Sequence, residues 1–158
     1  MRLWHKDLIP VLPQKHLIAQ WRELCAIAKN IATNGTPNHV LVNPVLDYYV
    51  LHYKTYCSLI IDEMVKRGIN YDQKSLNNLL FNIENGSKHF KKYRCVEKYK
   101  QTVDYEELYN GWMNDRYLLQ CFMNLQEKYD RGMFDVSEYK KIYKVVLKTL
   151  GKNFVLER

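Results

Sequence analysis

The residues best suited to chemistry in this 158-residue chain lie on one predicted helix, residues 13–31. At about 100° per residue, His16, Gln20 and Glu23 share the side of this helix opposite its apolar stripe. An imidazole, an amide and a carboxylate can together bind a polar ligand and move a proton. Two small residues beside them leave room for a ligand: Ala19 and Ala26. A ligand site and a solvated polar face both fit this pattern.

The other faces of this helix predict its packing and its charge. Apolar residues recur at spacings of three or four and predict a buried stripe: Leu17, Trp21, Leu24, Ala28 and Ile31. Lys15, Arg22 and Lys29 are spaced seven apart and form a cationic ridge next to Glu23. The helix therefore offers a core face, a face able to do chemistry, and a ridge able to contact an anion.

A second basic feature is the stretch 86–101, which reads GSKHFKKYRCVEKYKQ. A single acidic residue, Glu97, opposes six cations there: Lys88, Lys91, Lys92, Arg94, Lys98 and Lys100. Aromatic residues interleave with these cations. Cations that bind phosphates and rings that stack on bases are typical of nucleic-acid surfaces. A solvated run of charge is the alternative, and the pattern favours neither.

Composition narrows the class of protein. The net charge of +7 indicates an anionic partner, and 47% hydrophobic residues exclude a disordered chain. No uninterrupted apolar stretch reaches about 18 residues, so we expect no membrane span. The basic N-terminus lacks the apolar region of a signal peptide. The four cysteines are far apart in the sequence: Cys25, Cys57, Cys95 and Cys121. Because they form no C-x-x-C pair, we expect no metal site, and their usage is typical of a reducing compartment.

The positions of glycine, proline and capping residues predict an all-α fold. We expect helices over 13–31, 44–67 and 75–83, the third of them capped by Asp72. A fourth should run from Asn114 to about 128, and Ser137 should cap a last one. The chain length suits one domain, 1–158, arranged as a compact helical bundle.

Two motifs carry a resemblance to a known family. Residues 16–24, HLIAQWREL, resemble the H-L-x-A-x-x-R-E-L motif of the phage pyrimidine dimer DNA glycosylase, also called endonuclease V. Residues 63–70, EMVKRGIN, are similar to E-x-x-K-R-G-x-N in the same family. The likeness covers about residues 1–72, which leaves 73–158 as a helical extension that includes the basic segment 88–100. Residues 112–118, WMNDRYL, resemble a motif in bacterial relatives that also begin M-R-L-W-H.

The resemblance implies an activity and a set of site residues. Members are all-α DNA glycosylases that remove a damaged base and then cleave the strand by β-elimination, as abasic-site lyases. It implies that the Met1 α-amine attacks C1′ to form an imine and that Glu23 stabilises the cationic sugar and helps to move a proton. It also implies that Arg22 and His16 contact the DNA backbone near the lesion, where a base is flipped out, and that Arg2 takes the place of the family's following arginine. From the charge pattern we further expect DNA contacts from Lys15, Lys91, Lys92 and Arg94. No metal and no organic cofactor is implied.

Two positions depart from the family pattern. Arg2 is too large for the usual removal of the initiator methionine, so Met1 would supply the amine; otherwise the amine is displaced. Ala26 stands where the phage enzyme has an arginine, so the lesion can differ from a pyrimidine dimer. We expect a cytoplasmic, DNA-associated monomer that acts on double-stranded DNA with a damaged or modified pyrimidine. The alternatives are a non-catalytic DNA-binding module and an enzyme that acts on nucleotides or RNA.

Overall fold

The computed structural model describes residues 1–92 and 101–151. They form five α-helices: α1 (Gln14–Asn34), α2 (Val50–Lys66), α3 (Gln73–Gly86), α4 (Asp115–Asp130) and α5 (Val136–Leu150). Three short 3₁₀ helices complete the elements: η1 (Lys6–Val11), η2 (Asn43–Asp47) and η3 (Ser87–His89). The described residues contain no β-strand, only an isolated bridge between Tyr49 and Lys91. The predicted all-α class is confirmed.

Helix ends follow the capping residues at most of the predicted positions. The Asn114 side chain accepts a hydrogen bond from the Tyr117 backbone N–H (3.0 Å) at the start of α4. Asp72 caps α3 in the same way through Ser75 (3.1 Å). Gly35 ends α1 with a left-handed φ of 77°, a conformation that glycine adopts without strain.

Two predicted helix starts were wrong. Only the short η2, which starts at Asn43, forms around Pro44, and α2 starts at Val50, because Tyr48 has extended backbone (φ −117°, ψ 161°). The Tyr48 hydroxyl donates to the carbonyl of Asn110 (2.6 Å), a distant contact that local sequence does not reveal. At α5 the cap is Asp135, which accepts from the Glu138 backbone N–H (2.9 Å), and Ser137 lies within the helix.

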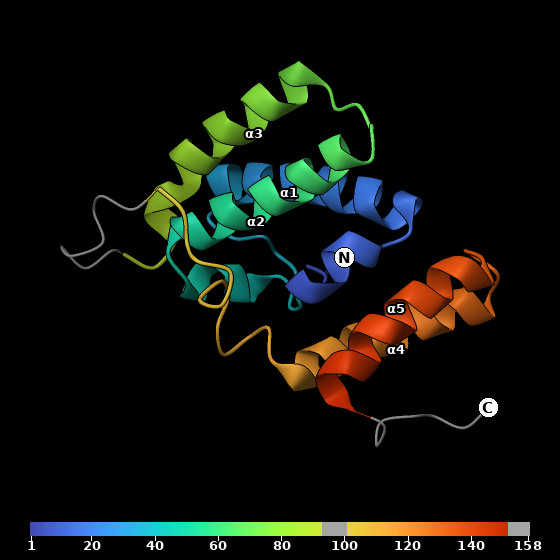
Figure 1. The fold of residues 1–158 in the computed structure, drawn as a ribbon. Helices are drawn as coiled ribbons and strands as arrows, with labels where there is room; N and C mark the ends of the chain where they lie inside the picture. The colour runs from blue at the N-terminus through green and yellow to red at the C-terminus, as the bar shows by residue number, and fades with distance from the viewer. Residues whose placement is uncertain (93–100, 152–158) are drawn as a thin grey trace.

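The elements form two groups with the N-terminal segment between them (Figure 1). In the first group α1 packs against α2 and α3, and in the second α4 and α5 form an antiparallel hairpin. Gly86 lets α3 approach α1 closely, because a Cβ there would lie 2.9 Å from the Ile31 side chain. η1 contacts both α2 and α5, so it joins the two groups.

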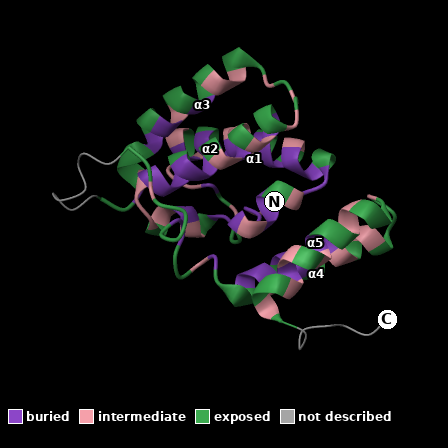
Figure 2. Cartoon of the chain, viewed as in Figure 1, coloured by how far each residue is buried: buried purple, intermediate pink, exposed green. Residues whose placement is uncertain are grey.

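The buried residues lie along the inner faces of both groups (Figure 2). The predicted apolar stripe of α1 is buried along its whole length, as expected. One connected hydrophobic cluster joins Leu3 and Leu8 of the N-terminal segment to Leu118 of α4 and Ile142 of α5. Among the described residues, no helix is long and apolar enough to cross a membrane.

Candidate active site

The buried side chain of Gln20 holds the N-terminal segment against α1. Its Oε1 accepts from the backbone N–H of Trp4 (2.8 Å), and its Nε2 donates to the carbonyl of Arg2 (3.0 Å). The same Nε2 lies 3.2 Å from Oε2 of Glu23. Gln20 is fully buried. One amide therefore fixes the chain that follows Met1 and also orients the carboxylate.

Two tyrosines hold the same segment from other elements. The Tyr56 hydroxyl of α2 lies 2.7 Å from the carbonyl of Trp4 and 2.9 Å from Oε1 of Gln20. The Tyr117 hydroxyl of α4 donates to the carbonyl of Leu3. Residues 2–4 are therefore bonded to α1, α2 and α4 together, which restricts where the terminal amine can lie.

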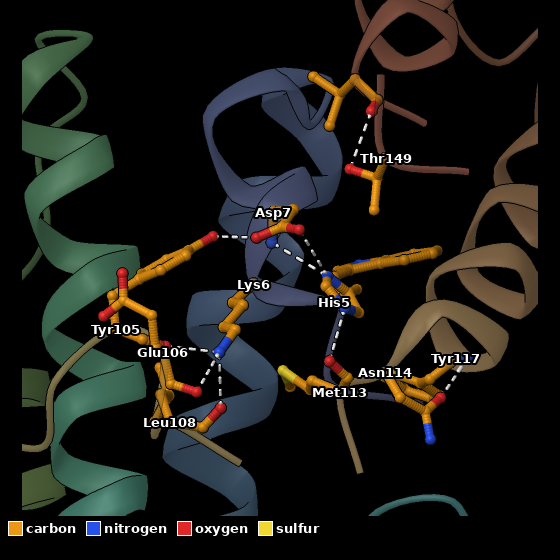
Figure 3. A network of polar contacts seen from close by, with 12 residues as sticks. His5, Lys6, Asp7, Tyr105, Glu106, Leu108, Met113, Asn114, Tyr117 and Thr149 are labelled. Carbon is orange, nitrogen blue, oxygen red and sulfur yellow. Dashed lines mark hydrogen bonds and ion pairs between the residues drawn. The ribbon is translucent and has the colours of Figure 1, made fainter. Parts of the chain in front are cut away.

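The next residues attach the segment to the chain that precedes α4 (Figure 3). The Nδ1 of His5 accepts from the Asp7 backbone N–H (3.1 Å), so Nε2 carries the proton and donates to the Met113 carbonyl (2.9 Å). The buried ammonium of Lys6 donates to the carbonyls of Tyr105 and Leu108, at 3.0 Å for the second. Because its donors have these partners, we assign Lys6 a structural role.

The second sequence motif fixes the far end of η1. Arg67 pairs through Nε with Glu63 (2.8 Å), and its other nitrogens donate to the carbonyls of Leu12 (2.6 Å), Pro10 (3.0 Å) and Ile9 (3.3 Å). The E-x-x-K-R-G stretch thus ties the end of α2 to the N-terminal segment.

Glu23 is a half-buried carboxylate beside the chain terminus. Burial raises its pKa above the ordinary value. The N-terminal ammonium, a hydrogen bond from the Arg2 backbone and the Lys128 ammonium act in the opposite direction and favour the carboxylate. A carboxyl group with a raised pKa and two cations nearby can stabilise positive charge as the carboxylate and can also accept a proton.

The face predicted to lie away from the core is covered at His16 and Gln20, whereas Ala19 and Ala26 are exposed. His16 is 7% exposed, with its ring 6.2 Å from Trp4 and 5.7 Å from Phe134 between their centroids. Burial lowers the pKa of His16, and the nearby Lys128 and Lys15 lower it further. Its Nδ1 has no hydrogen-bond partner among the described residues. The N-terminal segment and the turn after α4 cover this face.

The cationic residues predicted to bind DNA lie in two places, one along α1 and the N-terminal segment and one at the C-terminal end of α1. Lys15, Arg22 and Lys29 are exposed along α1, as the ridge predicts, and Arg2 is half-buried with its guanidinium 5.8 Å from the Trp4 ring centroid.

Lys91 and Lys92 are exposed at the other end of α1, where the His89 ring lies against Gly35. That end is about 18 Å from Glu23 along the helix, at 1.5 Å per residue. Arg94 and most of the basic segment lie outside the described residues.

Several residues of this site were not predicted. Gln20 was placed on the right face, but its clamp on Trp4 and Arg2 requires a segment that is distant along the sequence. Tyr56, Tyr117 and Lys128 carry no local signal, because each acts across a tertiary contact. Among the described residues, no group of three or more His, Cys, Asp or Glu side chains is arranged to hold a metal ion.

Comparison with known proteins agrees with the motifs. Residues 1–77 match the family model described as pyrimidine dimer DNA glycosylase. No curated protein and no solved structure matches the chain. The matched region contains the N-terminal segment, α1 and α2, and therefore Met1, Gln20, Glu23 and Arg67. Over these residues the chain is similar to the pyrimidine dimer DNA glycosylase family.

Proposed function

We propose that this protein removes a damaged or modified pyrimidine from double-stranded DNA and then cleaves the strand as an abasic-site lyase. The observation that carries the proposal is the pair of hydrogen bonds from Gln20, whose Nε2 donates to the carbonyl of Arg2 (3.0 Å) and to Oε2 of the half-buried Glu23 (3.2 Å). The residue after Met1 is thereby held beside this carboxylate. Hydrogen bonds that join Gln20, Tyr56 and Tyr117 to residues 2–4 hold this arrangement. An α-amine is less basic than a lysine side chain, so more of it is free base at neutral pH.

The chemistry follows from these two groups. The lone pair of the unprotonated Met1 amine attacks C1′, and the bond from C1′ to the base breaks as the base takes up one proton that the amine loses. The carboxylate of Glu23 stabilises the cationic sugar, as a carboxylate does in glycoside hydrolysis. The sugar ring then opens to an imine between Met1 and C1′, and O4′ takes up the second proton from the amine. Glu23 then accepts a proton from C2′, and the C3′–O bond breaks with departure of the 3′-phosphate.

DNA would lie across the exposed cations of α1. We infer that the exposed Arg22 and Lys15 of α1 and the half-buried Arg2 contact the DNA backbone, and that the exposed Lys91 and Lys92 at the other end of α1 add further contacts. Contacts of this kind add affinity that falls as the salt concentration rises. His16 can reach a phosphate only if Phe134 moves, since it is buried beneath that ring. We propose that residues 1–158 act as one domain and as a monomer.

Borohydride trapping on a duplex with one abasic site tests the amine. We expect a covalent adduct that disappears when one residue is added before Met1. Glu23→Gln should abolish strand cleavage while binding remains nearly unchanged. Glu107→Gln, at an exposed carboxylate outside the site, is the matched control and should cleave normally.

The alternatives give different results in the same assay. A wild-type protein that binds the duplex but forms no adduct would be a DNA-binding module without chemistry. A stronger preference for single-stranded RNA in competition binding would indicate the nucleotide- or RNA-directed enzyme. Cleavage that survives in Glu23→Gln would refute the role given to Glu23.

A further inference from the structure

A pocket lies between the N-terminal segment and α4, two parts of the chain that are distant in sequence. Its volume is about 430 Å³, and it is lined by Arg2, Leu41, Tyr117, Leu119, Gln120 and Met123. Four of these residues belong to α4, which lies outside the family-matched residues 1–77. The volume falls within the range of about 300–1,000 Å³ that is usual for small-molecule sites.

The chemistry of the walls suits a flat ring with polar edges. Leu119 and the exposed side chains of Leu41 and Met123 provide apolar surface. The Tyr117 hydroxyl is already bonded to the carbonyl of Leu3, so its ring acts as a wall. The exposed Gln120 amide has no hydrogen-bond partner among the described residues and offers both a donor and an acceptor.

The position of the pocket relates it to the proposed reaction. Arg2 lines the pocket and directly follows Met1, so the pocket wall includes the residue next to the one that carries the terminal amine. Arg2 also brings a positive charge to the rim, where the phosphate of an extruded nucleotide would lie. Leu41 and Met123 are 44% and 41% exposed, so their apolar surface at the pocket is open to a ligand.

We propose that this pocket receives the target nucleobase after it leaves the duplex, with Gln120 reading its hydrogen-bonding edge. This inference rests on the proposed glycosylase function. It assigns substrate selection to α4, so the chain beyond the family-matched region determines which base is removed. Enzymes that act on a base extrude it into a pocket lined by stacking and hydrogen-bonding groups.

Filling the pocket should affect base removal and leave the lyase step intact, because an abasic site has no base. We would compare Leu41→Trp and Met123→Trp with Leu80→Trp, which alters an exposed leucine of α3 outside the pocket. One assay is borohydride trapping on abasic duplex. The other is base release from duplexes that contain a cyclobutane thymine dimer or one of a panel of modified pyrimidines.

We expect all three variants to trap abasic DNA within about twofold of wild type. Base release should fall at least tenfold in Leu41→Trp and Met123→Trp and stay unchanged in Leu80→Trp. Normal base release in both pocket variants would refute the proposal that this pocket receives the target base. A wild-type protein that traps abasic DNA but releases no base of the panel would refute it as well. A wild type that forms no adduct would instead refute the proposed function. Gln120→Leu should change the order in which bases are released, and an unchanged order would refute its reading role.

Discussion

Replacing Gln20 should affect both stability and the rate of imine formation, because its one buried amide holds both the N-terminal segment and Glu23. Gln20→Met keeps the approximate size of the side chain and removes all four of its hydrogen bonds. Tyr56 keeps a second acceptor, the carbonyl of Trp4, so it is not left unpaired. The main-chain N–H of Trp4 and the carbonyl of Arg2 lose their partners.

The cost follows from those two groups. A buried polar group without a partner costs about 1–3 kcal/mol, and the half-buried Arg2 carbonyl can recover part of this from water. We therefore expect Gln20→Met to lower the free energy of unfolding by about 2–4 kcal/mol. A displaced amine costs more in rate than in stability, because a shift of about 1 Å in a reacting group can slow a step about 100-fold.

Two measurements check this prediction. Urea unfolding followed by circular dichroism gives the change in stability, and single-turnover trapping on abasic DNA gives the rate of imine formation. Gln14→Met, at the exposed first residue of α1, is the matched control and should change neither by much. A Gln20→Met protein that retains wild-type stability and trapping rate would refute the idea that this amide positions the terminus.

Three further predictions concern charge and anchoring. Lys128→Met removes a cation that favours the Glu23 carboxylate, so the pKa of Glu23 should rise. The acidic limb of the pH profile of the cleavage rate should then move to higher pH. An unchanged profile would contradict this prediction. Burial lowers the pKa of His52 to about 4, with Lys6 adding to the effect, whereas an unfolded histidine titrates near 6.5. The stability that neutral His52 contributes is therefore complete above about pH 6.5, and about 3 kcal/mol of it is lost as the pH falls towards 4. In unfolding titrations, His52→Gln should lose correspondingly less stability over this pH range. A loss equal to that of the wild type would show that His52 is not its source. Arg67→Met should lower the free energy of unfolding by about 2–3 kcal/mol, because it removes the hydrogen bonds to the end of η1. Arg131→Met, which removes an exposed ion pair, is the control and should lower it by less than about 1 kcal/mol in the same urea experiment.

The sequence by itself determined much of the local structure. Apolar spacing placed the buried face of α1, and Asn114 and Asp72 marked the starts of α4 and α3, because caps and amphipathic periods depend on neighbouring residues. The motif around Glu23 was enough to indicate the family, since its residues lie within three helical turns.

Tertiary structure alone decided how those residues work together. Periodicity placed His16 and Gln20 opposite the core, yet both are buried, because residues 2–4 and Phe134 pack on that face. Burial of that kind depends on segments more than 100 residues apart, as in the bond from Tyr117 to Leu3. The terminal amine is placed beside Glu23 by such contacts, and α4 adds the wall of the pocket that we propose for the base. The helix pattern contains the catalytic candidates, but only long-range packing gives them a common site.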